Sequence, residues 1–174
     1  MALIIGTDTY ITAADCSTYL ASVYLSTDAK LIAWNALSEA NKDICLRNAA
    51  KIIDRQPLQG VKYLSTQTME FPRATWTDYG DNDWRVRGVR LFSDHWYSNA
   101  AVPDKVKLAQ CEIALDLAQG TTDAQNRAEL QRQGVKSFSV GKLSESYSGV
   151  TGDITSAAAK QLLIPFVARS VRIV

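Results

Sequence analysis

Apolar residues recur at helical spacing in several stretches of the chain, and the longest stretches begin and end at residues typical of helix ends. The first follows Thr12, which can cap a helix, and extends to about Val23. The second begins after Ser38, a favoured N-cap, and ends near Arg55, before Pro57. Its expected apolar stripe is Ile44, Cys45, Ala49, Ile52 and Ile53. These patterns predict two amphipathic helices in the first third of the chain.

Two further helices are expected in the second half. One starts at Pro103, a residue favoured in the first turn, and ends before Gly120. The other follows Thr155 or Ser156 and is ended or interrupted by Pro165.

Between these helices the hydrophobic period changes. Residues 121–134 carry few apolar side chains, which indicates a solvated helix or a mobile arm. In residues 135–147, Phe138 and Val140 alternate with serines, a glycine follows, and Leu143 resumes the pattern. This alternation predicts a small β-hairpin.

The elements define one mainly α domain over residues 1–174, a small bundle of about four helices with a hairpin arm at 135–147. Residues 74–98 form an aromatic-rich insertion between the second and third predicted helices. Residues 164–174 form a C-terminal tail that we expect to dock, and its last part, residues 168–174, shows no periodic pattern of its own.

The insertion combines aromatic residues with arginines. Single-strand nucleic-acid binders use this combination for base stacking and phosphate contacts, and protein–protein interfaces use it for desolvated anchors. The same aromatic residues could instead pack the segment onto the helices, so both interpretations stay open. The candidate interface residues are Trp76, Trp84, Arg85, Arg87, Arg90 and Trp96, with Phe138, Val140 and Leu143 of the predicted hairpin.

The tail is apolar and basic. The net charge of the chain is +1, and no acidic residue follows Asp153. An exposed terminus of this kind is expected to dock, either on a partner or on its own core. The candidate docking residues are Ile164, Phe166, Val167, Arg169, Val171, Arg172, Ile173 and Val174.

Composition argues against several functions. The near balance of 19 basic and 18 acidic residues disfavours a general electrostatic grip on nucleic acid. The apolar residues 1–5 lack a basic leader and no stretch reaches about 20 apolar residues, so we expect no signal peptide, no membrane contact and a cytoplasmic site of synthesis.

Catalytic and metal-binding chemistry is also not expected. The 3 cysteines have no CxxC spacing, and we expect them to be small core residues. The lone His95 leaves no nucleophile–base pair, and the acidic cluster at 78–83 lacks the calcium-loop pattern. We therefore expect no cofactor, no metal and no enzymatic activity.

Five short segments carry a family resemblance. They are residues 33–42 (AWNALSEANK), 69–73 (MEFPR), 102–103 (VP), 135–141 (VKSFSVG) and 162–166 (LLIPF). In their order they resemble the head–tail adaptor, or connector, proteins of tailed bacteriophages, some of which are labelled DnaT-like single-strand DNA-binding proteins. The resemblance covers roughly residues 10–70 and 100–168, and residues 74–98 resemble an insertion.

The resemblance implies a helical bundle with a hairpin arm that forms a ring, typically dodecameric, beneath the portal protein. Such a ring extends the DNA channel, lets double-stranded DNA pass without specific binding, and presents a surface to the next neck or tail protein. The C-terminal segment, here Ile164 through Val174, would reach the portal. The chain would be found in the host cytoplasm before assembly and then in the neck of the virion.

The sequence thus predicts a structural head–tail adaptor that is not an enzyme. The alternative is a single-strand nucleic-acid-binding module that uses segment 76–97.

Overall fold

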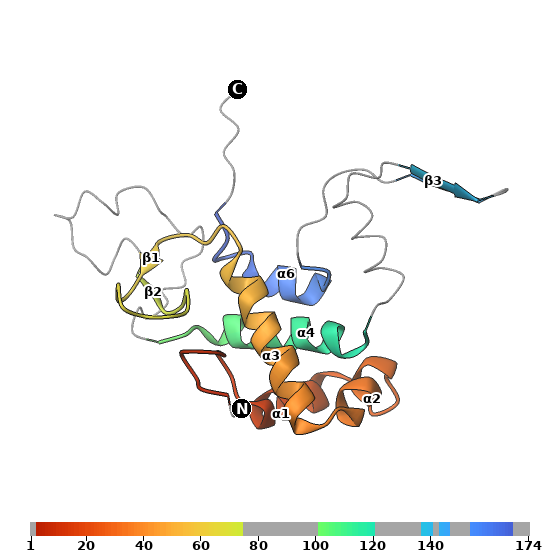
Figure 1. Ribbon diagram of the computed structural model, residues 1–174, viewed down its shortest axis with the longest axis horizontal. Helices are drawn as coiled ribbons and strands as arrows, with labels where there is room; N and C mark the ends of the chain where they lie inside the picture. Colours follow the sequence, from red (N-terminus) through yellow and green to blue (C-terminus); the bar gives the residue numbers. More distant parts are fainter. Residues whose placement is uncertain (1–2, 75–100, 121–136, 141–142, 147–153, 169–174) are drawn as a thin grey trace.

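Helix α4 (Asp104–Ala118) lies at the centre of the fold, and the other helices pack around it (Figure 1). The computed structural model describes residues 3–74, 101–120, 137–140, 143–146 and 154–168. Every residue of α4 from Ala109 to Leu115 is buried, so this helix has no solvent-facing side over two turns. Such a helix must be apolar or have its polar side chains satisfied internally.

Three helices precede the β structure: α1 (Ala13–Val23), α2 (Ala29–Ala36) and α3 (Glu39–Asp54). Each begins at a capping side chain, from Thr12, Asp28 and Ser38 respectively, that accepts a hydrogen bond from a backbone N–H of the first turn. The predicted first and second helices are confirmed as α1 and α3. Helix α2 was not predicted, because it is too short to show a repeated apolar period.

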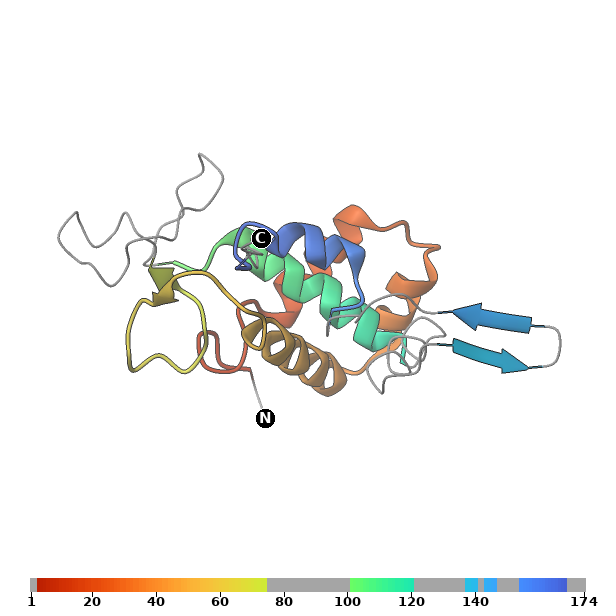
Figure 2. The ribbon, with the colours of Figure 1, turned by 90° about the horizontal axis from the view of Figure 1, so that it is seen from above.

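Helix α6 (Ala157–Leu163) begins at Ser156, whose hydroxyl caps the N–H of Ala159. Seen from above, α4 lies between α3 and α6 (Figure 2). The part of the chain that the structure describes therefore contains five helices, and the predicted mainly α bundle is confirmed.

The expected stripe on α3 was partly wrong. Its buried residues are Leu46, Ala49, Ala50 and Ile53, whereas Ile44 is 50% exposed. The buried face is rotated because α4 packs on α3 along this line. The prediction for the cysteines is confirmed: all three are free, with Cys16 and Cys111 buried and Cys45 partly buried.

Two antiparallel ribbons lie at opposite ends of the molecule (Figures 1 and 2). β1 (Val61–Lys62) pairs with β2 (Arg73–Ala74), a ribbon too short for any sequence signal. β3 (Ser137–Val140) pairs with β4 (Leu143–Ser146), inside the predicted hairpin 135–147, which is confirmed.

A buried glutamine joins the N-terminal segment to the core. Gln110 of α4 is fully buried. Its carbonyl accepts from the N–H of Tyr10 (2.9 Å), and its amide donates to the Thr9 hydroxyl (2.7 Å) and the Leu46 carbonyl (2.8 Å). One side chain thus connects α4, α3 and the chain that precedes α1.

We predict that Gln110→Met lowers the free energy of unfolding by about 2–4 kcal/mol, because a buried N–H and a buried carbonyl lose their partner. Urea denaturation measures the change. Gln161→Met, on the exposed surface of α6, is the matched control and should shift the midpoint little. Equal midpoints for the two variants would contradict the role assigned to Gln110.

Candidate functional site

The candidate interface residues are distributed unevenly over the structure. Trp76, Trp84, Arg85, Arg87, Arg90 and Trp96 lie outside the described residues, as do Arg169, Val171, Arg172, Ile173 and Val174. Phe138, Val140 and Leu143 lie in the β3–β4 hairpin, and Ile164, Phe166 and Val167 follow α6. What the structure does describe is how the chain is fixed just before residues 75–100 and just before residues 169–174.

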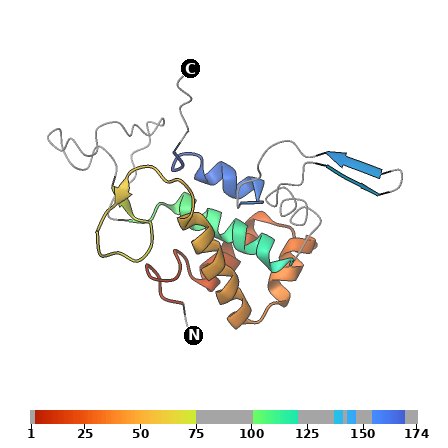
Figure 3. The same ribbon diagram turned by 45° about the horizontal axis from the view of Figure 1, so that its top comes forward.

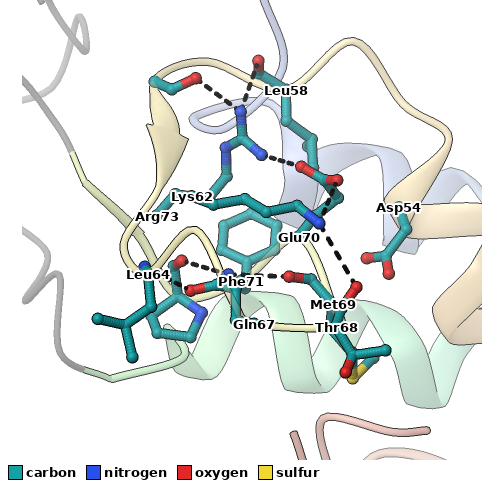
Figure 4. Close-up of polar contacts among 12 residues, drawn as sticks. Asp54, Leu58, Lys62, Leu64, Gln67, Thr68, Met69, Glu70, Phe71 and Arg73 are labelled. Carbon is teal, nitrogen blue, oxygen red and sulfur yellow. Dashed lines mark hydrogen bonds and ion pairs between the residues drawn. The ribbon is translucent and has the colours of Figure 1, made fainter. Parts of the chain in front are cut away.

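Arg73, in β2, fixes the chain ahead of residues 75–100 (Figure 4). Its Nε donates to the carbonyl of Gln59 (2.7 Å), and its Nη2 donates to the carbonyls of Gly60 (2.6 Å) and Leu58 (3.4 Å). Its Nη1 donates to the carboxylate of Glu70. The Arg73 side chain is only 11% exposed, so its guanidinium is an internal crosslink.

Further polar contacts stabilise the loop between β1 and β2. The second carboxylate oxygen of Glu70 lies 3.2 Å from Nζ of Lys62, so two cations share this carboxylate. The amide of Gln67 donates to the carbonyls of Met69 (2.8 Å) and Pro72 (2.9 Å), and its oxygen accepts from the N–H of Leu64 (3.0 Å). Figure 4 shows these groups converging on the start of β2.

The same region fixes the chain ahead of the C-terminal tail. The N–H of Gln59 donates to the carbonyl of Phe166 (2.8 Å), and its side-chain amide donates to the carbonyl of Val167 (2.8 Å). The N–H of Ala168 donates to the carbonyl of Pro57 (2.6 Å), and Leu58 forms an antiparallel bridge with Val167.

Residues 57–60, here called the anchor segment, therefore serve both attachment points. Gln59 donates to the tail through its N–H and side-chain amide, and accepts from Arg73 through its carbonyl. The two segments that the sequence predicts to interact with partners leave the helical core from a shared backbone support.

Part of the predicted docking tail belongs to the core of its own chain. Phe166 is 5% exposed, and its ring packs edge-on against Phe71, with centroids 5.6 Å apart. Phe71 packs in the same manner against Tyr10, at 5.9 Å. Ile164 is 43% exposed. Of the predicted docking residues in the described part of the chain, Ile164 is thus the most accessible.

Tyr10 joins α3 to the chain that leads into β2. Its hydroxyl donates to the carboxylate of Asp54 and accepts from the N–H of Phe71 (3.2 Å). Burial raises the pKa of Tyr10 far above its ordinary value, and the negative Asp54 raises it further. Burial also raises the pKa of Asp54. The Tyr10 hydroxyl therefore stays protonated, and its role is structural, as a donor to Asp54 and an acceptor from Phe71.

The carboxylate of Glu112 is buried in the core. It is 2% exposed and accepts from the hydroxyls of Tyr19 (2.9 Å) and Tyr24 (2.6 Å). Burial, together with the hydrogen bond to Glu112, raises the pKa of both tyrosines well above their ordinary value. This arrangement fastens α1 to α4. Among the described residues no three potential metal ligands converge.

Ion pairs neutralise many cations of the described surface. Lys30 lies 2.8 Å from Asp116, Lys107 lies 2.9 Å from Asp104, and Arg47 lies 3.8 Å from Asp8. Paired cations contribute less to binding a phosphate backbone than free ones. Within the described ranges no helix is long and apolar enough to cross a membrane.

Sequence reasoning assigned no role to Gln59, Glu70 or Arg73. The run 69–73 contributed only to the family resemblance. Arg73 and Gln59 donate to backbone carbonyls, and no residue pattern encodes such contacts. The one signal that could have indicated the site is a lone arginine directly before the aromatic insertion.

Comparison with known proteins identifies the family. The model of the family described as "Putative DnaT-like ssDNA binding protein" matches residues 1–174, and the chain belongs to this family. No curated protein and no solved structure matches the chain. The resemblance to proteins carrying the DnaT-like label is thereby confirmed.

We predict that Arg73→Met lowers the free energy of unfolding by about 2–4 kcal/mol, because the carbonyls of residues 58–60 and the Glu70 carboxylate lose a charged donor that is itself largely buried. Arg73→Lys should recover little, since an ammonium cannot reproduce the planar fork. Urea denaturation measures both. Arg55→Met, on an exposed neighbouring position, is the control. Full stability of Arg73→Met would show that the crosslink contributes nothing.

Proposed function

We propose that this protein binds single-stranded DNA through segment 76–97. The observation that carries the proposal is the match of the whole chain to a family described as single-strand DNA-binding. The composition of the segment supports it, because tryptophans stack on bases and arginines contact phosphates irrespective of sequence.

The charged side chains of segment 76–97 are of both signs, three arginines and four aspartates, at 78, 81, 83 and 94. On the helices, Lys30, Arg47 and Lys107 are engaged with carboxylates, and such paired cations contribute less to binding a polyanion. Binding through the segment therefore rests on Arg85, Arg87 and Arg90 as individual phosphate contacts and on base stacking, and not on an excess of positive charge.

The geometry of attachment also favours binding. The chain enters the segment from β2 and returns into α4 at the same end of the molecule, and Arg73 fixes the entry (Figure 2). A loop with restrained ends loses less conformational entropy when it closes on a ligand.

The proposal predicts binding of a fluorescent oligothymidylate with a salt slope, log Kobs against log [salt], of about −2, from three arginines at about −0.7 each. Replacing Arg85, Arg87 and Arg90 with Gln should bring this slope close to zero. Trp84→Ala should weaken binding by about 1–3 kcal/mol and leave the slope unchanged. Fluorescence anisotropy across a salt series measures both quantities.

The charge-matched control replaces Arg55, Lys105 and Lys160, cations without a partner carboxylate among the ion pairs of the described residues. It should retain most of the affinity. An absence of binding at low salt, or an equal loss in the control, would refute the proposal.

A second candidate is the head–tail adaptor, a structural subunit without enzymatic activity. The observation in its favour is the β3–β4 hairpin, which extends away from the helices as an arm (Figures 1 and 3). A subunit of a ring needs two different contact patches, and an arm is suited to be one of them. Its partners would be further copies of the chain, the portal protein and the next neck or tail protein, with double-stranded DNA passing through the ring.

For this candidate we predict that a chain ending at Ala168 no longer adds a ring to the portal in electron microscopy. Its helical circular-dichroism signal should persist, because the hydrogen bonds from Gln59 to Phe166 and Val167 are retained. Ring formation by the truncated chain would exclude residues 169–174 as the portal contact. Truncation at residue 163, which removes the buried Phe166, is the control that should destabilise the fold.

A further inference from the structure

One aromatic ring of the described residues lies open to solvent. The other aromatic residues whose exposure the structure describes are buried or have their hydroxyl bonded in the core: Tyr10, Tyr19, Tyr24, Trp34, Phe71 and Phe166. Tyr63, directly after β1, is 39% exposed. Its hydroxyl has no hydrogen-bond partner within the described ranges. The fold therefore makes no use of this ring, unlike the others.

The β1–β2 ribbon has two faces of different chemistry. Lys62 and Arg73 are cross-strand partners, and both contact the carboxylate of Glu70 on what we call the inner face (Figure 4). Because successive residues of a strand alternate between faces, Val61 and Tyr63 belong to the opposite, outer face. Val61 is 47% exposed, so the outer face is open to solvent.

The backbone on both sides of Tyr63 is fixed. The N–H of Tyr63 donates to the carbonyl of Pro72 (3.1 Å), and the N–H of Leu64 donates to the side-chain oxygen of Gln67 (3.0 Å). The amide of Gln67 donates in turn to the Pro72 carbonyl (2.9 Å). A rigid aromatic side chain on a fixed backbone loses little conformational entropy when a planar ligand stacks on it.

The outer face adjoins the segment to which we assign DNA binding. Val61 pairs with Ala74, which ends β2 and directly precedes residues 75–100 (Figure 1). In the sequence, Trp76 follows Ala74 by two positions. Tyr63 therefore lies close to the point at which the chain enters the aromatic segment.

The charge and size of the outer face suit a nucleic-acid base. Glu70 is the only acidic residue in positions 55–77, and it is bonded to two cations on the inner face, so a phosphate backbone meets no unpaired carboxylate of the ribbon. Two exposed side chains offer far less than the roughly 800 Å² that each partner of a stable protein complex buries. One base, in contrast, needs only one ring to stack on.

We propose that Tyr63 stacks on a base of the single-stranded DNA that segment 76–97 binds. The inference rests on the function proposed above and adds to it a contact from the described part of the fold. The contact is made by the ring and not by the hydroxyl. Because every base has a stacking face, Tyr63 adds affinity without adding sequence preference.

The first test compares variants of position 63 by the anisotropy of a fluorescent oligothymidylate, after urea denaturation has confirmed that each is folded. Tyr63→Ala and Tyr63→Leu should each weaken binding at least about fivefold with an unchanged salt slope, because both remove an uncharged ring. Tyr63→Phe keeps the ring and should bind as wild type does. Ile44→Ala, at an exposed apolar position of α3, is the matched control and should also bind normally. Full binding by Tyr63→Leu would overturn the inference.

The second test is photo-crosslinking of the wild-type protein to an oligonucleotide that contains 5-iododeoxyuridine. Trypsin, which cleaves after Lys62 and Arg73, releases residues 63–73 and 74–85 as separate peptides, and mass spectrometry locates the crosslink within each. We expect crosslinks in both peptides, at Tyr63 in the first. Crosslinks in residues 74–85 alone would overturn the role of Tyr63 and leave DNA binding by the segment intact. A wild-type protein that does not bind the oligonucleotide would overturn both proposals.

Discussion

The structure depends on the requirement that backbone polar groups removed from water find partners. The anchor segment 57–60 meets this requirement from two directions. Its carbonyls accept hydrogen bonds from the guanidinium of Arg73. The N–H of Gln59 donates a hydrogen bond to the carbonyl of Phe166, in the chain that follows α6. Neither ribbon β1–β2 nor the tail is long enough to be stable alone. Each is held because this segment, which continues from α3, supplies the missing partners.

The helices provide the rigid part of this arrangement. α4 is buried on all sides over two turns, and both of its buried polar side chains form hydrogen bonds with neighbouring elements. Gln110 bonds to α3 and to the N-terminal segment, and Glu112 bonds to α1. No buried side-chain polar atom of the described residues lacks a hydrogen-bond partner. Because each buried polar side chain needs its particular partner, the hydrogen bonds specify one packing of the helices. The segments with candidate functions then extend from a core that is fixed independently of them.

The sequence predicted the elements that carry repeated local signals. Thr12, Ser38 and Ser156 mark helix starts because a capping side chain acts within one turn, and the alternation around Phe138 marks the hairpin. Helix α2 and ribbon β1–β2 escaped prediction because each is too short for a period to repeat. The face of α3 was misplaced because tertiary packing on α4, and not hydrophobicity alone, decides which residues are buried.

The candidate site was predictable only in part. Composition located the aromatic insertion and the basic tail, but not that Gln59 contacts both Arg73 and Val167, the latter 108 residues further along the sequence. Contacts to backbone atoms leave no trace in residue type. Likewise, Phe166 was assigned to the tail since its pattern is apolar, whereas the structure buries it against Phe71.

Native-state amide hydrogen exchange of the Arg73→Met variant tests most directly whether one anchor segment supports both attachment points. Loss of the guanidinium should accelerate exchange at Gln59, whose N–H donates to Phe166, and at Ala168, whose N–H donates to Pro57. Exchange within α4 should quicken only as far as the loss of global stability requires. Unchanged protection at Gln59 and Ala168, with the insertion side alone affected, would show that the two attachment points are independent.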